Sequence, residues 1–253
     1  MNGRVNKMLQ NEDILGIIPA RMASTRFPGK PVVLINGVPM VIRVYREASR
    51  ALQNLVIASG DDEIEAVARQ YGAKFVHTSD DHTSGTSRCA EAMKTYSAKT
   101  GQTFKAILNI QGDEPMVNPA VISVLANDIS RPETGISTLI KPEVDQEAFK
   151  NPNRVKVVLN RDGFALYFSR SPLPYYRTPG TAWFSHIGMY AFKKEILEQI
   201  VELEPGILEN AESLEQLRWL ENGYPIHCCE SNYSGFGIDS PEDLALLLKS
   251  GLL

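Results

Sequence analysis

Short apolar runs alternate with amphipathic stretches along the first half of the chain. The apolar, partly β-branched runs predict strands at 14–18, 55–58, 73–76 and 106–110. Apolar residues at helical spacing predict helices between them at 39–52, 61–68 and 87–97. Strands that alternate with helices in this way are typical of a parallel sheet with helices on its faces.

The pattern changes after about residue 132, where strands follow one another with few helices between them. Further strands are predicted at 136–140, 155–160, 164–169, 186–192 and 226–230. Arg161-Asp162-Gly163 predicts a hairpin turn, because glycine readily adopts positive φ. Helices are predicted at 212–222 and 241–249, the second with Ser240 as its N-cap. We therefore expect an α/β fold with a Rossmann-like mixed sheet and an antiparallel extension.

The 253 residues show no low-complexity segment and no linker rich in proline, glycine or serine. We expect one domain at 14–253 after a poorly ordered N-terminal extension at 1–13. That extension lacks the apolar core of a signal peptide, and every apolar run is too short to span a membrane. The sequence therefore predicts a soluble protein.

Charge and cysteine content narrow the function. The net charge of −4 and the pI of about 5.7 argue against a general nucleic-acid binder, which usually carries a basic surface. Cys89, Cys228 and Cys229 match neither a disulfide framework nor a C-x-x-C motif, which favours a reducing cytosol. Cys228 and Cys229 would point to opposite faces of a strand, so we expect them to be packing residues.

A cationic segment (residues 20–30) directly follows the first predicted strand and contains no carboxylate. Its cations, hydroxyls and flexible glycine are Arg21, Arg26, Lys30, Ser24, Thr25 and Gly29. Ligands of open α/β sheets bind beyond the carboxyl ends of the strands, so this segment is predicted to bind a small anion. It is not a P-loop, because Pro31 follows Lys30. By composition alone, a solvated basic loop is an equally good interpretation.

Carboxylates occur at two other informative positions. Gln111-Gly112-Asp113-Glu114-Pro115 follows the strand predicted at 106–110. A carboxylate there suits magnesium, which binds oxygen and is often held by one or two carboxylates together with phosphates. An ordinary polar turn is the alternative. Asp239 precedes a predicted helix, where carboxylates are common for structural reasons.

Two more polar segments could bind a ligand. The first, DDHTSGTSR at 80–88, lies between a predicted strand and a predicted helix, where backbone N–H groups are free. Its His82, taken alone, is more often a structural residue. The second ends at Arg170, whose guanidinium can bind a carboxylate through two hydrogen bonds. Asn153 and Lys156 are interpreted as ordinary residues of a strand with exposed polar ends.

These segments together resemble the sugar nucleotidyltransferases, and most closely the 3-deoxy-manno-octulosonate (Kdo) cytidylyltransferases. The resemblance runs from about residue 14 to the last helix and includes the segments IPARMASTRFPGKP, DHTSGT, QGDEP, NPNRVKVV, YFSR and GFGIDSPEDL. It implies the reaction CTP + Kdo → CMP-Kdo + pyrophosphate, which serves lipopolysaccharide synthesis. It further implies a fold of the nucleotide-diphospho-sugar transferase type, Mg²⁺ as cofactor and a homodimer. From the cysteines, the charge and the apolar runs we also expect a cytoplasmic location and no nucleic-acid or membrane partner.

The resemblance also implies roles for individual residues. Nucleotide binding is implied for Ala20, Arg21, Ser24, Thr25, Arg26, Lys30, Ser84, Gly85, Thr86, Arg88, Gln111 and Asp113. Sugar binding is implied for Arg170, His186, Tyr190, Glu215 and Gln216, with a dimerisation and sugar-binding subregion near 132–200. Asp113 and Asp239 are the implied magnesium ligands, and they form the catalytic set together with Arg21 and Lys30.

Two departures from the family pattern leave details open. The family's A-T-D after the second strand is replaced by Ala58-Ser59-Gly60-Asp61, and the loop at 172–183 is short. The nucleotide contact near Asp61, the residues at the rim of the sugar pocket and the dimer contacts are therefore left open. Another acidic sugar, such as sialic acid, would suit the same anion and metal sites. A non-catalytic nucleotide-binding regulator is a further alternative, but a pure binder does not need a second metal carboxylate.

Overall fold

A mixed sheet forms the centre of the molecule in the computed structural model, which describes residues 8–24, 26–178, 181–233, 235 and 237–251. Its parallel half contains β1 (Ile14–Pro19), β4 (Asn54–Ser59), β5 (Phe75–His77) and β6 (Ala106–Asn109). The connecting helices are α1 (Met40–Ala48), α2 (Asp62–Gln70) and α3 (Gly85–Thr100). The predicted alternation of strands and helices is confirmed here.

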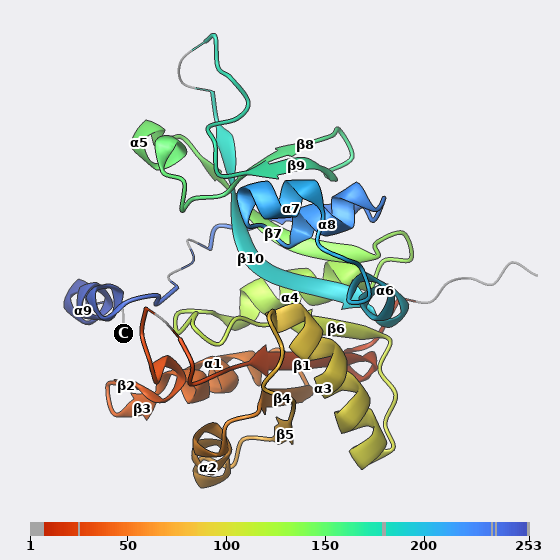
Figure 1. The fold of residues 1–253 in the computed structure, drawn as a ribbon, viewed down its shortest axis with the longest axis vertical. Helices are drawn as coiled ribbons and strands as arrows, with labels where there is room; N and C mark the ends of the chain where they lie inside the picture. The colour runs from red at the N-terminus through yellow and green to blue at the C-terminus, as the bar shows by residue number, and fades with distance from the viewer. Residues whose placement is uncertain (1–7, 25, 179–180, 234, 236, 252–253) are drawn as a thin grey trace, which may run out of the picture.

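The other half of the sheet contains the antiparallel strands (Figure 1). It is built from β7 (Ile136–Glu143), β8 (Lys156–Leu159), β9 (Ala165–Ser169), β10 (Trp183–Lys193) and β11 (Ile226–Glu230). The strand order is β11-β7-β10-β6-β1-β4-β5, and the β8–β9 hairpin branches from β10. β10 pairs antiparallel to both β6 and β7 and so joins the two halves. The predicted mixed sheet with an antiparallel extension is confirmed.

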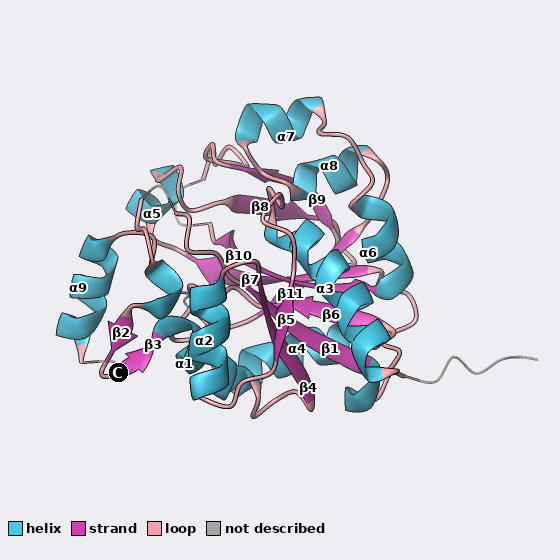
Figure 2. Ribbon diagram, turned by 60° about the horizontal axis from the view of Figure 1, so that its bottom comes forward, coloured by secondary structure: helices cyan, strands magenta, loops and turns pink. Residues whose placement is uncertain are grey.

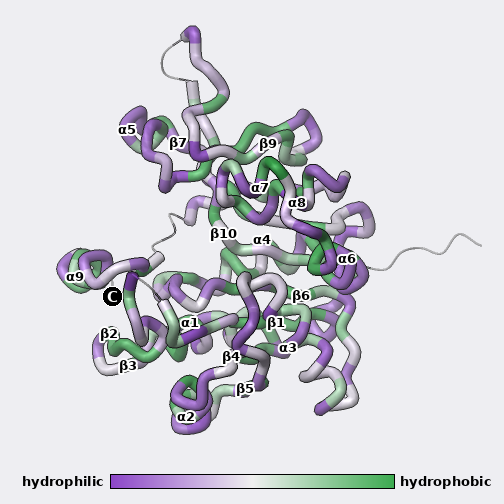
Figure 3. The backbone as a smooth tube through the Cα atoms, in the orientation of Figure 1, coloured by the Kyte–Doolittle hydropathy of each residue, from purple (hydrophilic) through white to green (hydrophobic). Residues whose placement is uncertain are grey.

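Helices cover both faces of the sheet (Figure 2). On one face, α3, α6 (Lys194–Ile200) and α8 (Gln216–Glu221) pack on a core that includes Leu15 and Ile17. On the other face, α1, α2 and α4 (Pro119–Ile129) pack on a core that includes Ile14 and Ile18. Hydrophobic and hydrophilic positions alternate along outer helices such as α2, which has one buried side (Figure 3). β1 is therefore buried on both faces, as its apolar run predicts.

The remaining elements are short or peripheral. α5 (Gln146–Lys150) follows β7, and β2 (Leu34–Ile35) pairs with β3 (Val38–Pro39) around the turn at Asn36-Gly37. Residues Lys30–Val32 form a 3₁₀ turn. The last helix, α9 (Pro241–Ser250), begins with a capping box between Ser240 and Asp243, so the predicted N-cap is confirmed. α9 lies beside the β2–β3 hairpin, where Leu247 and Ile238 join Ile35 and Met40 in a small core (Figures 1 and 2).

Several helices differ from the sequence prediction, and α5 and α6 lie outside every predicted helix. The single helix predicted at 212–222 is wrong, because the chain forms α7 (Ile207–Glu212) and then α8. Ser213 separates them with a φ of +52°, a left-handed conformation that interrupts helical hydrogen bonding. α4 was not predicted. It is rich in β-branched residues, and its apolar residues are not confined to one stripe, so its sequence lacks a clear helical period.

The structure also tests the predictions for the N-terminal extension and for the cysteines. Residues 1–7 lie outside the described part, but Asn11–Asp13 form an ordered 3₁₀ turn. The Asn11 side chain donates to the Ala51 carbonyl and accepts from the Gln53 N–H, which fixes this part of the expected extension. Cys228 packs in one core and Cys229 against the other, as their strand alternation predicts. Among the described residues, every helix is too short or too polar to cross a membrane.

Candidate active site

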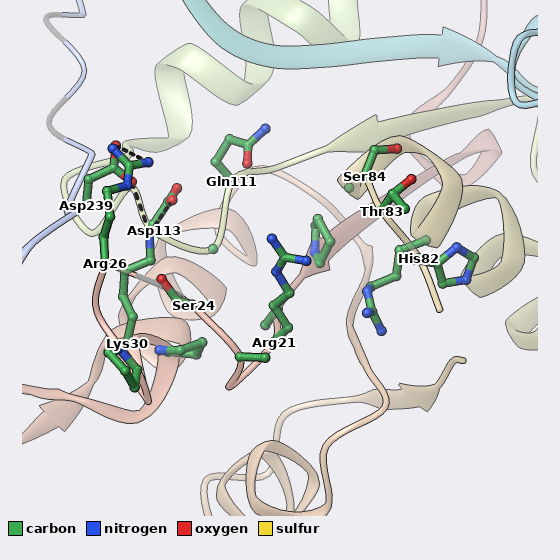
Figure 4. Close-up of a pocket in the computed structure, with 18 residues that line it drawn as sticks. Arg21, Ser24, Arg26, Lys30, His82, Thr83, Ser84, Gln111, Asp113 and Asp239 are labelled. Atoms are coloured by element: carbon green, nitrogen blue, oxygen red, sulfur yellow. Dashed lines mark hydrogen bonds and ion pairs between the residues drawn. The ribbon is translucent and has the colours of Figure 1, made fainter. Parts of the chain in front are cut away.

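A pocket of about 750 Å³ opens at the carboxyl ends of β1 and β6 (Figure 4). Three loops and the start of α3 contribute to it. Of the residues predicted to bind nucleotide or metal, it is lined by Ala20, Arg21, Ser24, Arg26, Lys30, Ser84, Gly85, Arg88, Gln111, Asp113 and Asp239. Thr25 lies outside the described residues. The topology has thus gathered residues from four separate segments, because the carboxyl ends of parallel strands share one edge.

The cationic segment is held in place by Asp61. One carboxylate oxygen of Asp61 accepts a hydrogen bond from the Met22 N–H at 2.8 Å and another from Ser59 Oγ at 3.2 Å. The segment then turns back at Gly29, whose φ of +72° favours glycine, and the Gly29 N–H bonds the Met22 carbonyl. Asp61 therefore positions the segment, a role that the sequence left open.

Lys30 lies between the two carboxylates that were predicted to share a metal ion. Its Nζ is 2.7 Å from Asp113 Oδ2 and 3.3 Å from Asp239 Oδ1, and its side chain is only 14% exposed. Arg26 makes a more exposed ion pair with Asp239 at 3.2 Å. Two residues 126 positions apart in the sequence (113 and 239) thus converge on one cation. This juxtaposition could be expected from the family resemblance but not from local sequence.

Backbone and side-chain contacts hold the loop before α9 against the turn after β6. The Ile238 N–H donates to the Asp113 carbonyl at 2.9 Å, which brings Asp239 beside Asp113. The Tyr233 hydroxyl donates a hydrogen bond to Glu114 at 2.7 Å, which is a second link between the loop before α9 and the turn after β6. Gly112 permits the close approach of β1, because a Cβ there would lie 3.0 Å from the Pro19 carbonyl oxygen.

The donor set formed by Asp113 and Asp239 fits magnesium. Both side chains offer carboxylate oxygen, the ligand type that Mg²⁺ prefers. Their oxygens already surround a single cationic group, the Lys30 ammonium. Arg26 and Lys30 line the same pocket, where their cations suit the phosphates of a nucleotide. Asp113 and Asp239 are therefore the residues suited to hold a magnesium ion.

The second polar segment forms the opposite wall of the pocket. Ser84 caps α3 by accepting a hydrogen bond from the Ser87 N–H. His82 bonds Ser87 through Nδ1 and Glu91 through Nε2, so the loop is tied to α3. Arg88 is buried and donates to Thr78 Oγ1 at 2.7 Å. Burial lowers the pKa of Arg88, although Asp80 and Asp61 oppose this shift, and the guanidinium stays charged.

The described lining of the pocket includes none of the predicted sugar residues, but Glu215 reaches the wall of the pocket. Glu215 accepts a hydrogen bond from Thr86 Oγ1 at 2.7 Å, which joins the start of α8 to the start of α3. Burial raises the pKa of Glu215, and the bond from Thr86 partly offsets this. The His186 ring lies 4.9 Å from the Phe168 ring and 5.4 Å from the Tyr190 ring, and burial lowers its pKa to about 3.

Arg170 is held by backbone carbonyls. Its guanidinium donates to the carbonyls of Glu212 at 2.7 Å, Pro152 at 3.1 Å and Ser213 at 3.3 Å. A sugar carboxylate would have to replace some of these bonds. Lys156 supports the same region and is fully buried, with Nζ donating to three carbonyls that include that of Arg170. The interpretation of Lys156 as a residue at an exposed polar strand end is therefore wrong, because its ammonium joins the ends of β8 and β9.

Comparison with known proteins identifies the class. A model of the family described as "Cytidylyltransferase" matches residues 15–230, so the chain belongs to the cytidylyltransferase family. A solved structure described as CMP:2-keto-3-deoxy-manno-octonic acid synthetase complexed with CTP is similar, with a TM-score of 0.87 at 35% identity. That likeness covers 94% of this chain and 97% of the other. A 4-diphosphocytidyl-2C-methyl-D-erythritol synthase from Anaerococcus prevotii, at 13% identity and a TM-score of 0.60, shares the fold.

Curated relatives of this chain share one name within the cytidylyltransferase family. A protein of Cytophaga hutchinsonii is 46% identical over 94% of this chain and 97% of its own length. One of Bacteroides thetaiotaomicron is 45% identical over 91% of this chain and 94% of its own, and one of Pseudomonas syringae is 44% identical over 90% and 94%. All three are named 3-deoxy-manno-octulosonate cytidylyltransferase. The resemblance inferred from the sequence motifs is thus confirmed.

Proposed function

We propose that this chain is a Kdo cytidylyltransferase, which transfers the cytidylyl group of CTP to Kdo and releases pyrophosphate. The observation that carries this proposal is the convergence of Arg26, Lys30, Asp113 and Asp239 at one pocket edge. Cations there suit a triphosphate, and paired carboxylates suit the ion that accompanies it. The names of the relatives supply the sugar and the base.

The reaction requires an in-line displacement at the α-phosphorus. The anomeric hydroxyl of Kdo attacks that phosphorus, the bond to the β-phosphate oxygen breaks, and its electron pair leaves with pyrophosphate. The hydroxyl proton passes to solvent. Arg21 and Lys30 neutralise the charge that develops on the phosphates, and Arg26, Ser24 and Thr25 position them. Such transfers depend mainly on positioning and charge stabilisation, which fixed cations provide.

Asp113 and Asp239 would hold Mg²⁺ in this proposal. When bound, the ion would offset phosphate charge and lower the pKa of the sugar hydroxyl. Lys30 now lies between these two carboxylates, so its ammonium would turn toward the phosphates when the ion binds. Before substrate binds, the ion pairs with Asp113 and Asp239 hold Lys30 and the cationic segment in place.

The sugar site is proposed at Arg170, His186, Tyr190, Glu215 and Gln216. Gln216 supports this placement, because it is 5% exposed and its Nε2 has no hydrogen-bond partner among the described residues. A buried donor of this kind is usually satisfied, and a sugar hydroxyl could satisfy it. The hydrogen bond between Thr86 and Glu215 joins the start of α8 to the start of α3, which supports a sugar site beside the nucleotide wall of the pocket.

We also propose a cytoplasmic homodimer. Val144 and Tyr175 support the dimer, because these large side chains are 70% and 89% exposed on the antiparallel extension. The three free cysteines agree with a reducing compartment. Light scattering in solution tests the dimer directly, and a monomeric mass at all accessible concentrations would exclude it.

One assay separates the proposed reaction from its alternatives. Pyrophosphate release is measured with CTP and Mg²⁺, with Kdo, with sialic acid and without sugar. We expect pyrophosphate release in the reaction with Kdo and none in the reactions with sialic acid or without sugar. Faster release with sialic acid would indicate the other acidic-sugar enzyme. CTP binding by calorimetry without release for either sugar would indicate a non-catalytic regulator.

A further inference from the structure

A cluster of polar and sulfur-containing side chains lies at the edge of the sheet formed by β11. Among the described residues, this cluster shares no residue with the lining of the nucleotide pocket. His227 and Cys229 are two residues apart in β11, so they lie on the same face. Asp128 and Arg131 come from the end of α4 and the turn after it, and Ser137 comes from β7. The strand period and the packing of α4 therefore bring three types of metal-binding side chain together.

The potential ligand atoms of this group point toward one another. Asp128 Oδ2 lies 2.9 Å and Cys229 Sγ 3.8 Å from the same ring nitrogen, His227 Nδ1. Ser137 Oγ is 2.6 Å from Asp128 Oδ2 and 3.4 Å from Cys229 Sγ. One atom each from Asp128, His227 and Cys229 thus lies within 4.8 Å of the other two.

This arrangement fits an ion better than a nucleophilic relay. In a Cys-His-Asp relay, the carboxylate and the nucleophile contact opposite nitrogens of the imidazole ring. Here both approach Nδ1. A tetrahedral zinc ion with bonds of about 2.0–2.3 Å keeps its ligand atoms roughly 3.3–3.7 Å apart. The observed separations lie on either side of that range, so only small side-chain shifts are needed.

A cationic group already contacts two members of the cluster. Arg131 Nη2 is 2.5 Å from Asp128 Oδ1 and lies 3.0 and 3.1 Å from the two ring nitrogens of His227. The Arg131 side chain is 38% exposed, so it can move outward to solvent without crossing the core. The cluster therefore favours positive charge and has a movable group that can yield to an ion.

We propose that Asp128, His227 and Cys229 form a zinc site distinct from the nucleotide pocket. Binding would displace the Arg131 guanidinium to solvent and release the thiol proton of Cys229 to the buffer. Bonds would form from zinc to Oδ2, Nδ1 and Sγ, with the Ser137 hydroxyl or a water as the fourth ligand. A mixed sulfur, nitrogen and oxygen donor set with a thiolate suits zinc rather than magnesium. The site would fasten α4 to the edge strand.

The test uses the full chain and a matched pair of cysteine variants. Co²⁺ serves as a probe because its bond to a thiolate gives a charge-transfer absorption band that oxygen ligands such as Asp113 and Asp239 cannot give. Cys229→Ala should abolish the band, and Cys228→Ala should retain it, because Cys228 faces the opposite core. Zinc should displace the cobalt stoichiometrically. No band in the wild-type protein, or a band that survives in Cys229→Ala, would overturn the proposal.

Arg131→Met provides an independent test, because this substitution should strengthen zinc binding rather than abolish it. Removing the competing cation should tighten zinc binding at least several-fold and make the melting temperature of the variant rise more with zinc than that of the wild type. A purely structural Asp128–Arg131 ion pair predicts a destabilised variant that zinc does not rescue. Unchanged zinc affinity in Arg131→Met, measured by competition with a chromophoric chelator, would therefore contradict the proposed site.

Discussion

Removing the Lys30 ammonium should damage catalysis far more than folding. In the free protein Lys30 pairs with Asp113 and Asp239, whose side chains are 32% and 49% exposed. Ion pairs with this degree of solvent contact contribute roughly 1 kcal/mol or less to stability. In the substrate complex the same ammonium would contact the triphosphate in a water-poor site, where a charge-assisted bond is worth about 1.5–3 kcal/mol. Lys30→Ala should therefore lower kcat/KM about 10- to 100-fold.

The assay follows pyrophosphate release over a range of CTP concentrations, with a thermal melt of each protein. Lys150→Ala is the matched control, because Lys150 makes an exposed ion pair with Glu147 in α5. That variant should match the wild type in both measurements. If Lys30→Ala keeps full catalytic efficiency, Lys30 has no phosphate role. If it fails to fold, its ion pairs are structural and the small stability estimate is wrong.

Two further substitutions test the sugar region. Arg170→Lys should raise KM for Kdo more than KM for CTP, because an ammonium cannot reproduce a bidentate fork, whereas equal losses would indicate a structural role. His186→Gln should change the pH dependence of stability. Since burial lowers the folded-state pKa of His186 to about 3, the unfolded chain binds more protons between pH 6.5 and 3, and stability falls as the pH falls through this window. Urea unfolding at pH 7 and pH 5 should therefore show a smaller decrease for the variant, and an equal decrease would contradict the assignment.

Local patterns predicted the main strands of the sheet and the helices α1, α2 and α3. The apolar run at 14–18 is β1, and the Arg161-Asp162-Gly163 turn joins β8 to β9. Ser213 shows where local patterns fail. The spacing of leucines around it predicts one continuous helix, but the left-handed conformation of Ser213 divides it into α7 and α8. Its conformation depends on tertiary packing, which local propensity does not contain.

The site was predictable as a list of residues but not as a set of contacts. The family motifs named Lys30, Asp113 and Asp239, yet the position of Lys30 between the two carboxylates depends on how the loop before α9 packs on the β6 turn. Asp61 was missed as the anchor of the cationic segment because its partner is a backbone N–H 39 residues away. Contacts to backbone groups leave little trace in a single sequence.

The shared use of one ion by Asp113 and Asp239 is the central claim, and a double-mutant cycle of magnesium-dependent turnover tests it most directly. Asp→Asn removes a charge and keeps nearly the same volume, so each variant should still melt cooperatively. Each single substitution should reduce kcat severely, and the double variant should be little worse than the poorer single one, because both side chains serve one ion. Near-normal turnover and unchanged magnesium dependence in Asp239→Asn, or losses that simply add, would contradict the claim.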